Sequence, residues 1–231
     1  MSARSRAFDE EDSMDDGASR RSRSSRVTAR LLLVAELARR GIGDERVLEA
    51  MSTVERHRYV DSCDAASAYD DRPLGIGFGQ TISQPYMVAL MAQAAEIAAT
   101  DTVLEVGTGS GYGAAVLGCL AAKVWTVERH EQLAGTAKQR LERDGFDRVT
   151  VVVGDGAKGW EPAAPFDAIV VTASPRMVPK RLLTQLAEGG RLIIPLGRPR
   201  DTQTLFRIRR TGFDLSEESL GPVRFVPLIA D

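Results

Sequence analysis

The chain has 231 residues, of which 43% are hydrophobic and 27% charged, and its formal net charge is −2. This length suits one globular α/β domain, and the near-neutral charge argues against a general nucleic-acid partner. No stretch approaches the roughly 20 apolar residues of a membrane span, and the two cysteines, Cys63 and Cys119, show no CxxC spacing, so we expect a cytoplasmic protein without membrane contact.

Residues 1–26 are polar, with an acidic run at 9–16 followed by an arginine- and serine-rich run at 20–26. Such a segment buries too little apolar surface to offset the entropy lost on ordering, so we predict a disordered tail. Contact between the basic run and RNA or an acidic surface is a second interpretation.

Residues 27–231 are predicted to form a single domain, with 27–100 as its mainly helical, substrate-side region. Apolar residues at helical spacing predict a helix over 27–40 that ends at Gly41. Asp44 is placed to cap a second helix through residue 51. Irregular structure or a short helix is expected over 62–71, a glycine-rich loop over 73–79, and a further helix from 83 to about 98.

From residue 101 onward, strands and helices alternate and are predicted to form a cofactor-binding sheet. The apolar runs are nearly continuous, which is typical of parallel strands covered on both faces. We expect strands at 102–107, 123–128, 149–154, 166–172 and 190–196, and helices at 111–120, 131–144 and 179–187. Two late strands, 203–210 and 223–228, lack a crossover helix and should pair antiparallel at the far end of the sheet. The predicted fold is a doubly wound, mostly parallel Rossmann-like α/β sheet with its site at the carboxyl ends of the strands.

A glycine turn follows the first of these strands, in the sequence Glu105-Val106-Gly107-Thr108-Gly109-Ser110-Gly111. The glycines allow the backbone to approach a ligand and open a helix N-terminus onto it. The carboxylate of Glu105 favours a cationic ligand over a pyrophosphate. We therefore count Glu105, Gly107, Thr108, Gly109, Ser110 and Gly111 as candidate cofactor-binding residues.

Other strand ends add hydrogen-bonding groups. Glu128 ends the second strand, where a carboxylate can accept from ribose hydroxyls. Asp155 and Gly156 end the third strand, where Asp155 can accept from an adenine amino group, although the pair also reads as an ordinary turn. Thr172 ends the fourth and is a secondary candidate. An NAD site is the competing interpretation, because the spacing alone does not exclude it.

The glycine turn, Glu128 and the Asp155-Gly156 pair together resemble the S-adenosylmethionine site of class I methyltransferases. An upstream motif, Gly79-Gln80-Thr81-Ile82-Ser83-Gln84-Pro85-Tyr86, resembles the protein-L-isoaspartate O-methyltransferases, a family of protein-repair enzymes. The resemblance runs from about residue 32 to the C-terminus and includes 39–48, 57–60, 69–74, 166–173, 189–197 and 223–228. Gly75 departs from it, because the family more usually has proline there.

The resemblance implies methyl transfer from S-adenosylmethionine to the free α-carboxylate of an L-isoaspartyl residue in a damaged protein. It implies a monomer in which Ser83 is the active-site residue and Thr81 and Ile82 line the acceptor cleft. Spacing alone also suits Ser83 as a helix N-cap. Arg224 is a candidate contact for the substrate carboxylate, although an exposed strand arginine is more common.

The acceptor carboxylate is already ionised at pH 7, so the reaction needs no general base. The two histidines, His57 and His130, lie outside any metal-ligand pattern, and no metal is expected. Two other functions remain open at this stage. One is a carboxyl methyltransferase with a different peptide acceptor, and the other is a module that recognises isoaspartyl residues without turnover.

Overall fold

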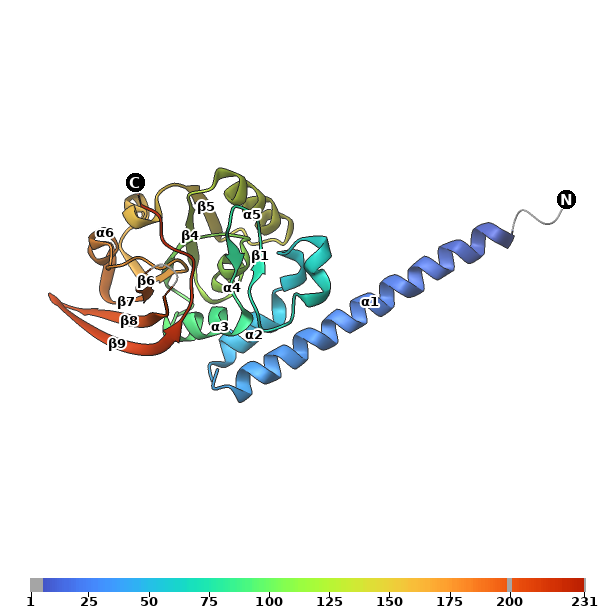
Figure 1. Ribbon diagram of the computed structural model, residues 1–231, viewed down its shortest axis with the longest axis horizontal. Coiled ribbons are helices and arrows are strands. Elements are labelled where there is room, and N and C mark those ends of the chain that lie inside the picture. Colours follow the sequence, from blue (N-terminus) through green and yellow to red (C-terminus); the bar gives the residue numbers. More distant parts are fainter. Residues whose placement is uncertain (1–5, 199–200, 231) are drawn as a thin grey trace.

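The computed structural model describes the backbone of residues 6–198 and 201–230, and the side chains of this part from Arg23 onward. The first helix, α1, spans Arg6–Arg39, and its N-terminal end leads away from the rest of the chain (Figure 1). It begins well before the predicted start at Val27, because no proline interrupts the segment. Residues 6–26 of the predicted tail thus lie within α1, whereas residues 1–5 lie outside the described part.

Two helices and a small hairpin follow α1. Asp44 caps α2 (Glu45–Thr53) as predicted, because its Oδ1 accepts from the backbone N–H groups of Arg46 at 2.9 Å and Val47 at 3.3 Å. Short 3₁₀ helices η1 (Arg56–Arg58) and η2 (Ser62–Ser67) lead to β1 (Leu74–Gly75) and β2 (Thr81–Ile82), which pair antiparallel. Helix α3 (Pro85–Ala94) ends before residue 98, because Glu96 takes a left-handed φ of 47°.

The main sheet has the strand order β5-β4-β3-β6-β7-β8-β9. The first five strands in this order pair parallel, and β8 pairs antiparallel with both β7 and β9. This arrangement confirms the predicted doubly wound sheet (Figure 1). The strands are β3 (Thr102–Val106), β4 (Lys123–Glu128), β5 (Val149–Val153), β6 (Phe166–Val171), β7 (Leu186–Leu196), β8 (Gln203–Thr211) and β9 (Asp214–Val223). The helices among them are α4 (Tyr112–Leu120), α5 (Glu131–Arg143), η3 (Gly156–Lys158), η4 (Glu161–Ala163) and α6 (Lys180–Thr184).

Helices cover both faces of the sheet. On one face, Val103, Val170 and Ile193 pack in one cluster with buried residues of α2, α3 and α4. The alternate residues, Leu104 and Ile169, point to the other face and pack with residues of α6. Because successive side chains of a strand point to opposite faces, burial on both sides requires the near-continuous apolar runs seen in the sequence.

Two predicted strands differ from the structure. The strand predicted at 223–228 is wrong, because β9 ends at Val223 and reaches β8 through a tight turn at Gly212, where φ is 62°. Residues 224–229 instead run back towards the carboxyl ends of the strands, with one bridge between Ser174 and Pro227. Strand β7 begins at Leu186 rather than at residue 190, because Leu186 pairs with Phe166 past an irregularity in the ladder.

Candidate active site

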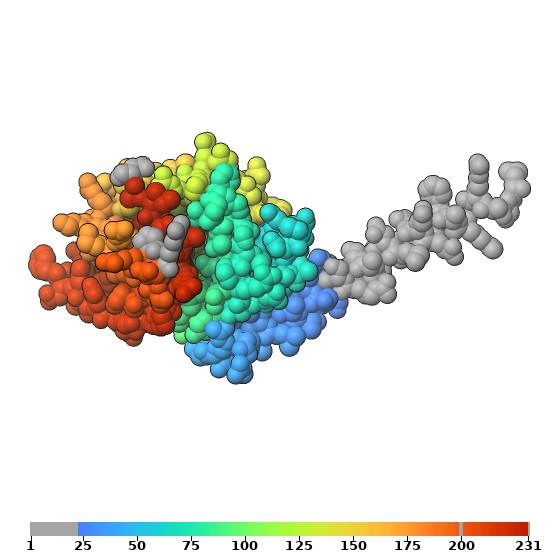
Figure 2. Space-filling model, in the orientation of Figure 1, coloured from blue at the N-terminus to red at the C-terminus, as the bar shows by residue number. Residues whose placement is uncertain are grey.

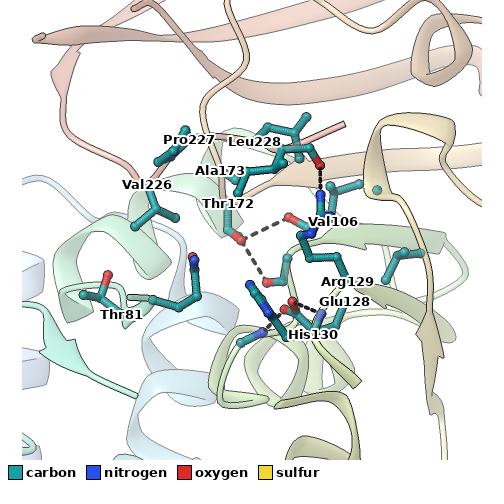
Figure 3. A pocket seen from close by; sticks show the side chains of 16 residues that line it. Thr81, Val106, Glu128, Arg129, His130, Thr172, Ala173, Val226, Pro227 and Leu228 are labelled. Atoms are coloured by element: carbon teal, nitrogen blue, oxygen red, sulfur yellow. Dashed lines mark hydrogen bonds between the residues drawn. The ribbon is translucent and has the colours of Figure 1, made fainter. Parts of the chain in front are cut away.

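A cavity lies at the carboxyl ends of β3, β4 and β6, where the sequence predicted a site (Figure 3). We call it the strand-end cavity. Five predicted cofactor residues line it, namely Gly107, Gly109, Glu128, Gly156 and Thr172. The β1–β2 hairpin contributes Gln80 and Thr81, and the C-terminal segment contributes residues 226–229.

The glycine turn is locked to the end of β6. Gly107 has a left-handed φ of 98°, and a Cβ added there would lie 2.3 Å from Thr172 Oγ1. The Thr172 hydroxyl is shared between two acceptors, the carbonyls of Gly107 at 2.8 Å and Val106 at 3.0 Å. Only glycine satisfies both the backbone angle and this close approach, so the backbone itself forms this part of the wall.

The Glu128 carboxylate is held by backbone groups at the edge of the cavity. Its Oε2 accepts from the N–H of Gly109 at 2.9 Å, and its Oε1 accepts from the N–H of His130 at 3.0 Å. Each carboxylate oxygen has about two acceptor sites. The fixed carboxylate therefore keeps capacity to accept from hydroxyl groups of a ligand.

Three other predicted cofactor residues point away from the cavity. Glu105 is only 1% exposed, and its Oε2 accepts from the Thr126 hydroxyl at 2.5 Å. Thr108 shares a 2.6 Å hydrogen bond with the same hydroxyl, and Ser110 Oγ accepts from the N–H of Tyr112 at 3.4 Å. The predicted contact between Glu105 and a cationic ligand therefore finds no support in this placement, because the carboxyl lies beneath the turn.

Burial sets the protonation of Glu105. It raises the pKa of this carboxyl to about 8; the Thr126 hydrogen bond opposes the rise, and the nearby Glu128 charge adds to it. Because desolvation penalises the charged form, the buried group favours the neutral acid. The carboxyl thus supports the turn as a largely uncharged hydrogen-bonding group.

Asp155 serves as the cap of a short helix. Its carboxylate accepts from the N–H of Ala157 at 2.9 Å, at the start of η3, and lies 3.5 Å from Lys158 Nζ. The cavity wall is made by Gly156, where a Cβ would lie 2.4 Å from Val106 Cγ1. This is the strand-ending turn that the sequence also allowed.

A second hollow adjoins the strand-end cavity and receives Ser83. This Ser83 pocket includes Gln84, Met87 and Arg224, and it shares Thr81, Thr172 and Val226 with the strand-end cavity. Ser83 and Arg224 thus meet in one pocket although they are far apart in the sequence. On the face shown in Figure 2, the surface around the β1–β2 hairpin borders that of the C-terminal segment.

Ile82 is the exception among the predicted acceptor-side residues. It is buried in the core, whereas Thr81 is exposed, because successive residues of β2 point to opposite sides. Ile82 therefore lies outside the lining of both hollows, where it anchors the hairpin that presents Thr81.

The Ser83 hydroxyl does not cap α3. The N-cap of this helix is Gln84, whose side chain makes no capping bond, and the Asp71 carboxylate takes the capping role. Asp71 Oδ1 accepts from the N–H of Tyr86 at 2.8 Å, and Oδ2 accepts from Gln84 Nε2 at 3.4 Å and pairs with Arg40. Within the part of the chain that the structure describes, the half-buried Ser83 hydroxyl makes no hydrogen bond to protein.

The C-terminal segment is held across both hollows by Gln203 and Arg129, which the sequence did not indicate, and by Ser174, a secondary candidate because it follows the fourth strand. The buried Gln203 amide brackets Phe225, accepting from its N–H at 2.7 Å and donating to its carbonyl at 3.3 Å. The Ser174 N–H donates to the Val226 carbonyl at 2.8 Å, and Arg129 Nη1 donates to the Ile229 carbonyl at 2.7 Å. The sequence signal for this segment is the apolar run at 223–228, which predicts a strand.

Neither a metal centre nor a membrane span is found in the described part of the chain. Among the side chains that the structure describes, from residue 23 to 198 and from 201 to 230, histidine, cysteine and carboxylate groups do not gather in sets able to hold a metal ion. No helix in the same ranges combines the length and apolar character needed to cross a bilayer.

Comparisons with known proteins agree on one family. The family model for protein-L-isoaspartate(D-aspartate) O-methyltransferase matches residues 29–231. A protein-L-isoaspartate O-methyltransferase of Protochlamydia amoebophila is 53% identical to this chain, over 84% of this chain and 93% of its own length. A protein-L-isoaspartate O-methyltransferase of Roseiflexus castenholzii is 54% identical, over 87% of this chain and 91% of its own length.

Solved structures give the same result. A protein-L-isoaspartate O-methyltransferase superposes with a TM-score of 0.79 at 30% identity, over 86% of this chain and 65% of the other. Another, from Plasmodium falciparum in complex with S-adenosyl-L-homocysteine, gives a TM-score of 0.76 at 29% identity, over 87% and 99%.

Proposed function

The chain belongs to the protein-L-isoaspartate(D-aspartate) O-methyltransferase family, and from this premise we propose how its residues divide the reaction among them. It is an S-adenosylmethionine-dependent enzyme that methylates the free α-carboxylate of L-isoaspartyl residues in damaged proteins. The ester product favours closure to a succinimide, which can hydrolyse to a normal aspartyl residue.

Two observations support the strand-end cavity as the site of the methyl donor. Its wall at Gly107 is bare backbone, because a Cβ there would meet Thr172 Oγ1, and Glu128 offers carboxylate acceptors for ribose hydroxyls. We propose that Gly107, Gly109, Glu128, Gly156 and Thr172 line the cofactor site, with Asp155 as the acceptor for the adenine amino group. Gly111 lies outside this lining and completes the turn as the N-cap of α4, with a left-handed φ of 91°. Glu105, Thr108 and Ser110 support the turn from beneath. S-adenosylmethionine supplies a methyl group that its sulfonium has already activated.

Ser83, Thr81 and Arg224 act on the acceptor. The Ser83 hydroxyl donates one hydrogen bond to the acceptor carboxylate, and the Arg224 guanidinium attracts it into the Ser83 pocket. The carboxylate is already ionised at neutral pH, so the chain has no proton to remove before attack. A single neutral donor orients the anion without withdrawing much of its charge.

This assignment of the methyl donor and the acceptor to separate hollows rests on the wall that the two hollows share. Because Thr81, Thr172 and Val226 line both, a donor in the strand-end cavity and an acceptor in the Ser83 pocket meet there. Catalysis then rests on positioning two reactive groups, which contributes about 7–11 kcal/mol in well-oriented systems.

Label transfer from S-adenosylmethionine tests the function directly. We expect the purified chain to methylate an isoaspartyl peptide and to leave its aspartyl twin unlabelled. Equal labelling of both peptides would reassign the acceptor, and cofactor binding without transfer would make the chain a recognition module. A panel of other peptide carboxylates completes the comparison.

We also infer a monomeric, cytoplasmic enzyme whose functional domain is 27–231. The free, exposed Cys63 and Cys119 suit a reducing compartment, and the family model begins at residue 29. Light scattering tests the oligomeric state, since a monomer of the full chain has a mass of 25.0 kDa. Removal of residues 1–26 should leave peptide methylation unchanged; loss of activity in a folded truncation would assign the segment a role in the reaction.

A further inference from the structure

The tip of the β1–β2 hairpin holds a phenylalanine in a backbone conformation that its side chain disfavours. The N–H of Gln80 donates to the Gly77 carbonyl at 2.8 Å, which closes a turn with Phe78 and Gly79 at its centre. Both central residues have positive φ, 54° at Phe78 and 68° at Gly79. Turns of this kind favour Asn, Asp or Gly at the first central position. Local sequence preference therefore does not explain Phe78.

Solvent exposure does not explain Phe78 either. The residue is 54% exposed, although a large apolar side chain gains most from burial. Its ring does have a partner, because it stacks on the imidazole of His130 with centroids 5.4 Å apart and planes inclined by 28°. A disfavoured backbone angle that presents an aromatic ring to a site residue points to a functional constraint.

His130 belongs to the wall of the strand-end cavity. Its backbone is fixed by the bond to Glu128, and its side chain lies beside Glu128 and Arg129 in Figure 3. The Nε2 atom is buried and has no hydrogen-bond partner among the described residues. A buried polar atom without a partner is unfavourable unless a ligand or water satisfies it.

The same hairpin also lies over the glycine turn. A Cβ added to Gly109 would lie 3.2 Å from Ile76 Cδ1. The hairpin therefore lies against two of the elements that carry proposed cofactor residues, the turn after β3 and the connection after β4.

We propose that Phe78 and His130 form a latch that holds the β1–β2 hairpin closed over the cofactor and slows its release, with His130 Nε2 as a hydrogen-bonding group towards it. The latch rests on the proposed function, because it requires the strand-end cavity to hold S-adenosylmethionine or its demethylated product. The pair itself acts by retention and takes no part in methyl transfer.

The test measures the affinity of the full chain for S-adenosyl-L-homocysteine by titration calorimetry and its dissociation rate by stopped flow. Phe78→Asn removes the ring and keeps a residue that tolerates positive φ. His130→Phe keeps the stack and removes Nε2, whereas His130→Ala removes both. Phe213→Ala is the matched control, because Phe213 is a fully exposed aromatic at the other hairpin turn, next to Gly212. Thermal melts confirm that each variant folds.

We expect Phe78→Asn to speed dissociation about two- to ten-fold, the range that one aromatic pair contributes. His130→Ala should speed it at least as much, His130→Phe should fall between His130→Ala and the unmodified chain, and the control should match the unmodified chain. In the double variant Phe78→Asn/His130→Ala, the change in activation free energy for dissociation should be smaller than the sum of the two single-variant changes, because both substitutions remove the same contact.

If the unmodified chain binds S-adenosyl-L-homocysteine, two results would overturn the latch without affecting the proposed function. One is unchanged dissociation in Phe78→Asn, and the other is full additivity in the double variant. If the unmodified chain itself failed to bind S-adenosyl-L-homocysteine, the proposed function would fall and the latch with it.

Discussion

The Thr172 hydroxyl donates to the Gly107 carbonyl across 2.8 Å, and the same oxygen occupies the space that a Cβ at position 107 would need. This contact joins the end of β6 to the turn after β3. Thr172 also lines both the strand-end cavity and the Ser83 pocket. Thr172 therefore both fixes the position of the turn and forms part of the wall that the two hollows share.

Gly107→Ala should abolish most cofactor binding. The substitution meets a left-handed φ and a 2.3 Å approach to Thr172 Oγ1, so the turn must shift. We expect the Kd for S-adenosylmethionine to rise at least about ten-fold, which corresponds to about 1.4 kcal/mol. Gly135→Ala is the control, because Gly135 lies within α5 with no atom within 4 Å of an added Cβ, and it should leave the Kd unchanged. An unchanged Kd in Gly107→Ala would remove the turn from the cofactor site.

Ser83→Ala should slow methylation of an isoaspartyl peptide and leave cofactor affinity almost unchanged. A hydrogen bond to a charged group contributes about 1.5–3 kcal/mol, so kcat/KM should fall roughly 10- to 150-fold. Ser83→Thr keeps a hydroxyl and should recover part of the rate. Steady-state kinetics combined with cofactor titration makes the comparison, and equal turnover in Ser83→Ala would exclude the serine from the mechanism.

Asp71→Ala should disturb the Ser83 pocket from outside it. The change removes the acceptor for the Tyr86 N–H at the start of α3 and the partner of Arg40. Loss of a helix cap costs about 0.5–2 kcal/mol, so the melting temperature should fall and kcat should drop with it. Asp70→Ala is the matched control, because Asp70 is exposed and pairs only loosely, at 3.3 Å, with Arg72. If both variants behaved alike, Asp71 would have no special role in placing α3.

The sequence predicted the sheet well because its signal is strong and local. The continuous apolar run at 168–171 in β6 is buried on both faces, as expected for a central strand of a parallel sheet covered on both sides. The cap at Asp44 and the glycine turn were also readable, since each depends on residues within a few positions. The late strand at 223–228 was mispredicted because Gln203 and Ser174 bond its backbone, and neither is near it in the sequence.

Side-chain direction was the harder part of the site. Glu105 and Ile82 both fall within recognisable motifs, yet both point into the interior. A motif gives the spacing of residues but not the face that each one takes on a twisted sheet. The cavity-lining role of His130 was missed for a similar reason, because its partner Phe78 lies on a hairpin far from it in the chain.

The buried Glu105 carboxyl should make stability depend on pH. Its pKa is raised to about 8 in the folded chain, whereas the unfolded group has the ordinary value of 4.5. Below pH 4.5 the group is neutral in both states. Between pH 4.5 and 8 the unfolded chain loses the proton first, so the free energy of unfolding falls as pH rises, by an amount on the order of a few kcal/mol.

Glu105→Gln should remove this dependence, because the amide is neutral and its oxygen still accepts from Thr126. Urea unfolding at pH 5, 7 and 9 measures the difference between the variant and the unmodified chain, and we expect the variant to gain relative stability as pH rises. Glu142→Gln controls for an exposed carboxylate, since its side chain is 65% exposed on α5. A difference that stayed constant from pH 5 to 9 would show that Glu105 ionises as readily in the folded chain as in the unfolded one, and it would remove the neutral acid from the description of the turn.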